Sequence, residues 1–135
     1  YRVGSTEYSD YPANHISKTR PDYVVAYGKS LWLDPGKPEV SAYVRRVVTD
    51  VVRRYNIDGV HLDDYFYPYP QKDKDGLPIL FADDVSYEQY RARGGAMSLA
   101  DWRRDNVNAL VKGLYNDIKA LKPHVKFGIS PFGIW

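Results

Sequence analysis

Two long segments carry apolar residues at the spacing of an amphipathic helix. The first, residues 38–55, opens with Pro38, which the first turn of a helix tolerates because the missing N–H would be unpaired there. The second, residues 99–121, follows Ser98, which forms a capping-box-like start with Asp101. We expect both apolar stripes to be buried. Their members are Val40, Tyr43, Val44, Val47, Val48, Val51, Val52 and Tyr55, and Trp102, Val107, Leu110, Val111, Leu114, Tyr115, Ile118 and Leu121.

Three short apolar runs alternate with these helices and are expected to be strands. They are residues 30–33, 59–63 and 125–130. Strands that alternate with helices are typical of parallel sheets with right-handed crossovers. We therefore predict that the three strands are adjacent and parallel, with both long helices on one face of the sheet.

The remaining segments show weaker patterns. Residues 1–29 lack periodicity and are expected to be an irregular lead-in. Residues 71–97 are expected to form an insertion loop that contains a turn at Asp75-Gly76, a small hairpin arm at 77–81 and a short helix at 84–93. The run Asp73-Lys74-Asp75-Gly76 is similar to part of a calcium loop with Gly76 at the sixth position. The twelfth position is then Ala82 and lacks the bidentate Glu, which favours a simple turn.

The order of these elements predicts an α/β protein that is a fragment of a (β/α)8 TIM-type barrel. Such barrels have about 250 residues, whereas this chain has 135 and about three parallel strands. Residues 1–135 are therefore expected to form one partial barrel domain. Open strand edges and uncovered apolar surface would allow self-association, because a monomer seldom exposes a large apolar patch.

Composition and charge exclude several classes of protein. The net charge of +2 is too small to indicate a nucleic-acid partner, and no apolar run reaches the length of a membrane span. The chain has no Cys and no Gly-rich phosphate-binding loop, and its His residues lack metal-ligand spacing. We expect no cofactor and no metal. Tyr accounts for 13 residues, and its flat apolar face with a polar tip suits sugar-binding clefts as well as packing.

Candidate catalytic groups cluster where the predicted strands end, as in TIM barrels. His61, Asp63 and Asp64 end the middle strand, and strand alternation places His61 and Asp63 on one face and Asp64 on the other. We predict that Asp63 is a catalytic carboxylate, with Asp64 as the second candidate and His61 as a substrate-binding residue. The structural alternative for Asp63 is a carboxylate that caps or braces the loop, and the equal alternative for His61 is a structural partner of Asp63.

Other candidates for contacts with substrate surround these residues in the predicted fold. Aromatic side chains stack on sugar rings, although the same loop could equally be a packed, rigid connection. The third strand ends in a further cluster that begins at Ser130. The candidate substrate-binding residues besides His61 are Tyr65, Tyr67, Tyr69, Asp34 and Trp135.

Four blocks of sequence resemble a bacterial family of glycosyl-hydrolase-like proteins, the tenth of its series. The blocks are residues 31–40, 55–68, 101–107 and 122–135. The resemblance implies a (β/α)8 barrel, a glycoside hydrolase role and export to the cell envelope, often as a lipoprotein. Some relatives are associated with the glycan strands of peptidoglycan.

The resemblance adds one detail about the site. The Asp58–Asp63 pattern is also similar to the fourth-strand motif of α-amylase-type barrels, in which the last Asp is the nucleophile. In other barrel clans that carboxylate is the acid/base, so the role of Asp63 stays open. The second carboxylate that a glycosidase needs is expected beyond Trp135. The competing hypotheses are a carbohydrate-binding module and a purely structural fragment.

Overall fold

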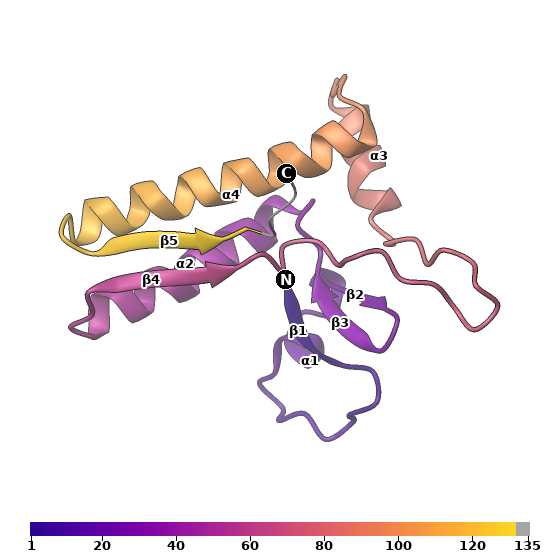
Figure 1. Ribbon diagram of the computed structural model, residues 1–135, viewed down its shortest axis with the longest axis horizontal. Helices are drawn as coiled ribbons and strands as arrows, with labels where there is room; N and C mark the ends of the chain where they lie inside the picture. The colour runs from indigo at the N-terminus through magenta and orange to yellow at the C-terminus, as the bar shows by residue number, and fades with distance from the viewer. Residues whose placement is uncertain (132–135) are drawn as a thin grey trace.

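The computed structural model describes residues 1–131 and is a mixed α/β protein (Figure 1). Two long helices run beside a pair of strands, and a small second sheet follows at the end toward which those strands point (Figure 1). The elements in chain order are β1 (Arg2–Ser5), α1 (Ile16–Thr19), the 3-10 helix η1 (Pro21–Tyr23), β2 (Val24–Tyr27), β3 (Ser30–Leu33), α2 (Pro38–Arg54), β4 (Gly59–Asp63), α3 (Asp84–Ala92), α4 (Leu99–Leu121) and β5 (Lys126–Ser130).

The strands β4 and β5 form a parallel pair, as predicted. Gly59 lies opposite Lys126, and Asp63 lies opposite Ser130. The connection between the strands contains α4, so that β4, α4 and β5 make one β–α–β unit. A core of Val52, Ile118 and Val125, with Val60 and Phe127 packed against it, joins the two strands to α2 and α4.

The prediction that residues 30–33 pair in parallel with the other two predicted strands is wrong. This segment is a strand, but β3 pairs antiparallel with β1 on one side and β2 on the other. The reason lies in the turn before it, where Gly28 has a φ of 55°. A tight turn with a residue of positive φ joins neighbouring strands as a hairpin, and a hairpin is antiparallel.

Residues 1–29 are also more regular than predicted. They contribute β1, β2 and two short helical turns. Tyr23, Leu33 and Val40 form the centre of their core, with Val3 and Ile16 packed around it. Each strand has four residues, which is too short for a clear period in the sequence.

The two long helices keep the predicted bounds but not every predicted buried residue. In α4, Leu110 and Leu114 are buried as expected. In α2, Val40 and Val52 are fully buried, whereas Val47 and Val51 are 46% and 42% exposed. Successive helical positions are rotated by about 100°, so α2 buries the stripe through Val40 and Val52 and leaves the neighbouring one open.

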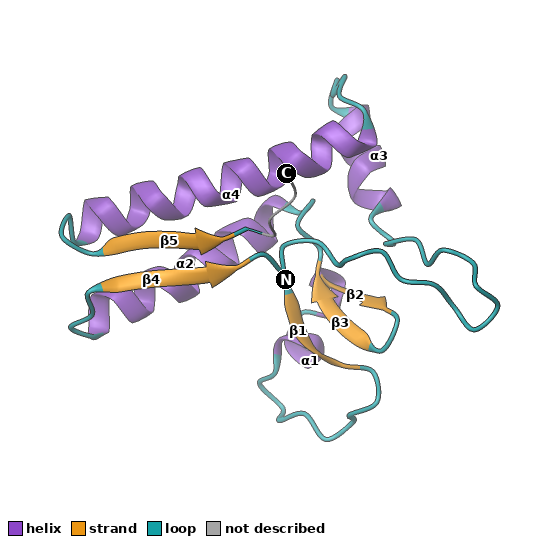
Figure 2. Cartoon of the chain, in the orientation of Figure 1, coloured by secondary structure: helices purple, strands orange, loops and turns teal. Residues whose placement is uncertain are grey.

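The insertion between β4 and α4 is mostly irregular and extends away from the strands (Figure 2). The predicted turn is present, because the N–H of Gly76 donates to the carbonyl oxygen of Asp73 at 3.1 Å. A bridge between Lys72 and Pro78 makes a minimal hairpin, and α3 follows as expected. The carboxylate of Asp73 accepts the N–H groups of Asp75 and Leu77, an arrangement that supports the turn interpretation.

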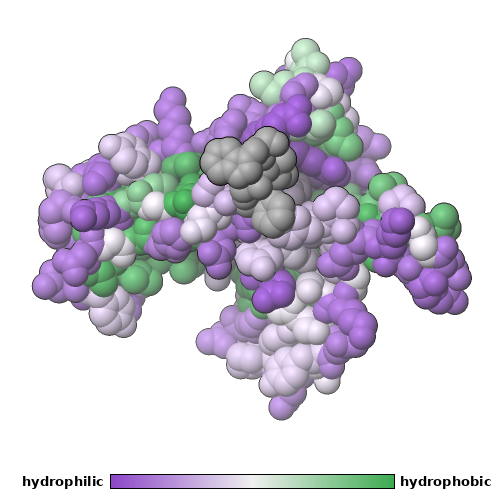
Figure 3. Space-filling model, viewed as in Figure 1, coloured by the Kyte–Doolittle hydropathy of each residue, from purple (hydrophilic) through white to green (hydrophobic). Residues whose placement is uncertain are grey.

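Hydrophobic surface is spread over several places on the visible face rather than gathered in one patch (Figure 3). Leu80 is the most exposed large apolar residue of the insertion, at 82%. Within residues 1–131, no helix combines the length and the hydrophobicity that crossing a membrane requires.

Candidate functional site

Two candidate residues, His61 and Asp63, lie on the face of β4 that points away from the long helices. Val60 and Phe127 pack against the helical core. Because side chains alternate along a strand, His61 and Asp63 lie on the opposite face, together with Gly128 and Ser130 of β5. The predicted shared face of His61 and Asp63 is confirmed, and both side chains are exposed.

His61 is held by two residues of the neighbouring strand. Its Nε2 lies 2.8 Å from Oγ of Ser130, a hydrogen-bonding distance. Gly128 lies directly opposite His61, and a Cβ atom at Gly128 would come within 3.2 Å of Nδ1 of the imidazole. The strand β5 thus supplies both the space and a hydrogen-bond partner for the ring.

We predict that Gly128→Ala displaces the imidazole of His61. The added methyl group needs the ring to move by a few tenths of an ångström, which stretches its hydrogen bond to Ser130. Nitrogen-15 NMR of the imidazole should show a change in the Nε2 signal, and Ser130→Ala should change the same signal. Unchanged imidazole signals in both variants would contradict this placement of His61.

A cavity of about 390 Å³ opens beside Asp63 at the end of β4. It lies toward the long helices, because Val44 of α2 and Leu110 of α4 line it, and His61 does not. It falls within the range of about 300–1,000 Å³ that is typical of ligand sites. Asp63 is its only carboxylate among the described residues. The lining residues are Tyr1, Arg2, Val44, Leu62, Asp63, Tyr65, Phe66 and Leu110.

Tyr65 is the predicted aromatic residue that the structure brings to this cavity. The residue is 47% exposed, and the centroid of its ring lies 6.5 Å from that of Trp32. The guanidinium of Arg2 lies 5.6 Å from the centroid of Tyr65, at cation–π distance. Sequence reasoning missed Arg2 and Gly128, because one lies in an apparently irregular segment and the other acts only through the side chain it lacks.

Asp64 and Tyr69 form a separate pair. The hydroxyl of Tyr69 donates a hydrogen bond to the carboxylate of Asp64, and this bond raises the pKa of Tyr69 to about 12. The rings of Tyr65 and Tyr69 meet edge to face at 6.2 Å. Tyr69 therefore lies beside the aromatic residue of the cavity, while Asp64 does not line the cavity.

Tyr67 points into the packing of the insertion. Its ring meets that of Phe81 edge to face at 5.5 Å, and Nδ2 of Asn106 donates to its hydroxyl at 3.3 Å. Burial raises the pKa of Tyr67. Tyr67 is not among the residues that line the cavity beside Asp63. Trp135 lies outside the described residues.

Asp34 ends β3 but is buried, with 1% of its surface exposed. Its carboxylate accepts hydrogen bonds from the hydroxyl of Ser86 and, at 2.8 Å, from the N–H of Gly36. These contacts tie α3 to the start of α2. Burial raises the pKa of Asp34 above its ordinary value of 3.8, and the two hydrogen bonds offset part of that effect.

We predict that Asp34→Asn gains stability relative to the native chain as the pH rises. Because the pKa is raised on folding, the folded state binds more protons than the unfolded state above pH 3.8. The stability due to protonated Asp34 is therefore lost as the pH rises through the pKa of the folded state. Urea unfolding of both proteins at about pH 4 and pH 7 measures this. If the free energies of unfolding of the two proteins differ by the same amount at both pH values, the prediction is wrong.

No group of His, Asp and Glu within residues 1–131 has the arrangement of a metal site. The groups that the site does offer are the Asp63 carboxylate, the His61 imidazole and the Tyr65 ring. A carboxylate at the C-terminal end of a parallel strand can act as an acid, a base or a nucleophile.

Comparison with known proteins identifies the family. The model of the family described as Glycosyl hydrolase-like 10 matches residues 4–135. The chain belongs to this family. It is 44% identical, over its whole length, to glycosyl hydrolase YngK of Bacillus subtilis strain 168, and spans 26% of that protein. It is 40% identical to glycosyl hydrolase DigH of Escherichia coli K12, with 94% of this chain and 27% of DigH covered.

The same figures hold for DigH of Shigella flexneri, at 40% identity with 94% and 27% coverage. The chain thus spans about a quarter of the length of the curated relatives that it matches. The family confirms the resemblance found in the sequence, and the names of its members support a glycoside hydrolase.

Proposed function

We propose that the full-length protein is a glycoside hydrolase and that Asp63 is one of its catalytic carboxylates. The observation that carries this proposal is the exposed Asp63 at the C-terminal end of β4, beside a cavity of about 390 Å³. Tyr65 offers an aromatic face in the same cavity, and His61 offers a ring nitrogen on the same strand face. Family membership supports the class of reaction.

We also propose that the chain is one part of a (β/α)8 barrel. The parallel pair β4–β5 with α4 between its strands supports this, because parallel β–α–β units build such barrels. The remaining strands would then pair with the free edges of β4 and β5. In that arrangement the sheet β1–β3–β2 belongs to the loops at the catalytic end of the barrel.

The proposed substrate is a bacterial or environmental polysaccharide, with peptidoglycan glycan strands as one candidate. Such polymers lie outside the cytoplasm, so we propose that the protein is secreted or held in the cell envelope. The test is to incubate the full-length protein with peptidoglycan glycan strands and with plant and fungal polysaccharides, and to measure new reducing ends.

A non-catalytic carbohydrate-binding role is the second candidate. It is favoured by the presence of one carboxylate alone in the described part of the cavity, because hydrolysis generally needs two that flank the scissile bond. The same assay separates the two functions. New reducing ends support the hydrolase, whereas saturable binding without cleavage supports the binding module.

A further inference from the structure

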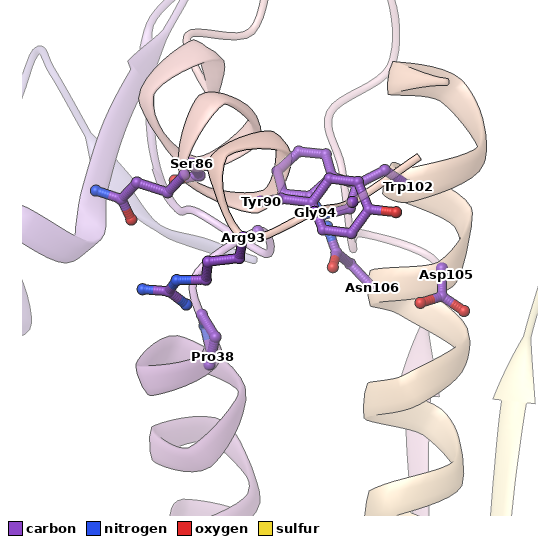
Figure 4. A pocket seen from close by; sticks show the side chains of 11 residues that line it. Pro38, Ser86, Tyr90, Arg93, Gly94, Trp102, Asp105 and Asn106 are labelled. Carbon is purple, nitrogen blue, oxygen red and sulfur yellow. The ribbon is translucent and has the colours of Figure 1, made fainter. Parts of the chain in front are cut away.

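A second cavity lies between α3 and the first turns of α2 and α4 (Figure 4). Its volume is about 390 Å³, and it shares no lining residue with the cavity beside Asp63. It is lined mainly by polar side chains and glycine backbone around an aromatic base. The lining residues are Gly36, Pro38, Ser86, Gln89, Tyr90, Arg93, Gly94, Gly95, Trp102, Asp105 and Asn106.

Three polar side chains of this cavity have no partner among the described residues of the protein. Among residues 1–131, the side chains of Gln89, Arg93 and Asp105 form no hydrogen bond or ion pair. Arg93 and Asp105 come from different helical segments and stand on different sides of the aromatic rings (Figure 4). A donor-rich cation and a carboxylate acceptor are therefore both available to a ligand.

The base of the cavity is rigid. Trp102 is 3% exposed, and its ring centroid lies 5.8 Å from that of Tyr90. The hydroxyl of Tyr90 accepts the N–H of Met97 at 3.1 Å, and Gly95 packs so closely that a Cβ atom there would overlap the ring of Tyr90. Gly94, with a φ of 90°, makes the turn that ends α3. The cavity is thus preorganised for binding.

The cavity and Asp63 lie at the same end of the α/β unit. A helix that connects parallel strands runs against them, so α4 begins at the end where β4 finishes. Figure 1 shows α3 and the start of α4 beyond the tips of the β4 and β5 arrows. A polymer bound beside Asp63 would therefore lie at the same end of the molecule as this second cavity.

We propose that the cavity around Arg93 and Asp105 is a second saccharide-binding site, for an uncharged sugar unit of a polysaccharide. Sugar hydroxyls both donate and accept hydrogen bonds, so they match a site with Arg93 on one side and Asp105 on the other. A carboxylated sugar would gain at Arg93 but meet the like charge of Asp105. This inference rests on the proposed function only in taking carbohydrate as the ligand.

The test measures saccharide affinity by calorimetry in the full-length protein carrying Asp63→Asn, which we expect to suppress turnover. The probes are cellohexaose and chitohexaose, which are neutral, and a hexamer of galacturonate. We expect Arg93→Ala and Asp105→Ala each to weaken binding of a neutral hexasaccharide about tenfold, the effect of losing a hydrogen bond to a charged group. Arg91→Ala, on the exposed side of the same helix, is the matched control and should bind like its parent.

Unchanged affinity in both cavity variants overturns the proposal, as does the absence of measurable binding of either neutral hexasaccharide. The proposal is also overturned if the two cavity variants weaken binding of the galacturonate hexamer but not of either neutral hexasaccharide. Thermal unfolding at the parent temperature confirms that each variant is folded. Failure of the hydrolase proposal is separate, because it is read from reducing ends released by the native protein and not from the effect of Arg93.

Discussion

Replacing Asp63 with Asn in the full-length protein is expected to lower glycan hydrolysis about 10²–10⁴-fold, the usual contribution of a positioned acid or base. Asn keeps the size of the side chain but cannot exchange a proton or attack a sugar carbon. The Asp63 side chain is exposed at the end of β4, so the substitution removes no packing from the core. The measurement is the rate of reducing-end release at equal concentrations of folded protein.

Asp64→Asn is the matched comparison for this experiment. Asp64 is the next residue, with the same side chain, but its carboxylate binds the hydroxyl of Tyr69 and does not line the cavity. We expect its loss of activity to be much smaller than that of Asp63→Asn. The reverse order would place the catalytic role on Asp64, and activity close to native in both variants would move that role off this strand.

The elements that could be predicted from the sequence are those with a long local period. The bounds of α2, α4 and β5 are within one residue of the prediction, because Pro38, Ser98 and Pro123 mark helix ends and the apolar stripes run for many turns. Pairing is harder to predict, since it depends on residues far apart in the chain. β3 looks like any buried strand, and only the turn at Gly28 indicates that it pairs antiparallel with β2.

In the candidate site, too, features set by the local sequence could be predicted and features set by distant partners could not. The shared face of His61 and Asp63 could be predicted because alternation is local. The orientation of the aromatic loop could not be predicted, since it depends on which partner each ring finds. Tyr65 meets Trp32 at the cavity, whereas Tyr67, two residues later, meets Phe81 in the insertion. In a strand, residues two apart share a face, but this rule does not hold in an irregular loop with several prolines.

One ion pair holds the insertion against α4. Nε and Nη2 of Arg103 donate to the carboxylate of Asp83 at 2.8 and 2.5 Å, in the bidentate geometry that favours Arg. The side chain of Asp83 is completely buried, and that of Arg103 is 31% exposed. Arg103 also lies 5.6 Å from the ring centroid of Tyr67, so it contacts the aromatic loop after β4 as well as Asp83.

Arg103→Met is therefore expected to destabilise the protein by about 3–5 kcal/mol, because it leaves a buried carboxylate without its partner. Arg104→Met is the control: the adjacent Arg104 pairs with Asp101 at 2.5 Å, but both side chains are mostly exposed, and little change is expected. Adding Asp83→Leu to Arg103→Met should recover much of the loss, since the unpaired charge is then absent. Urea unfolding of the full-length protein measures all three changes, and equal losses for Arg103→Met and Arg104→Met would show that the burial of Asp83 does not set the cost.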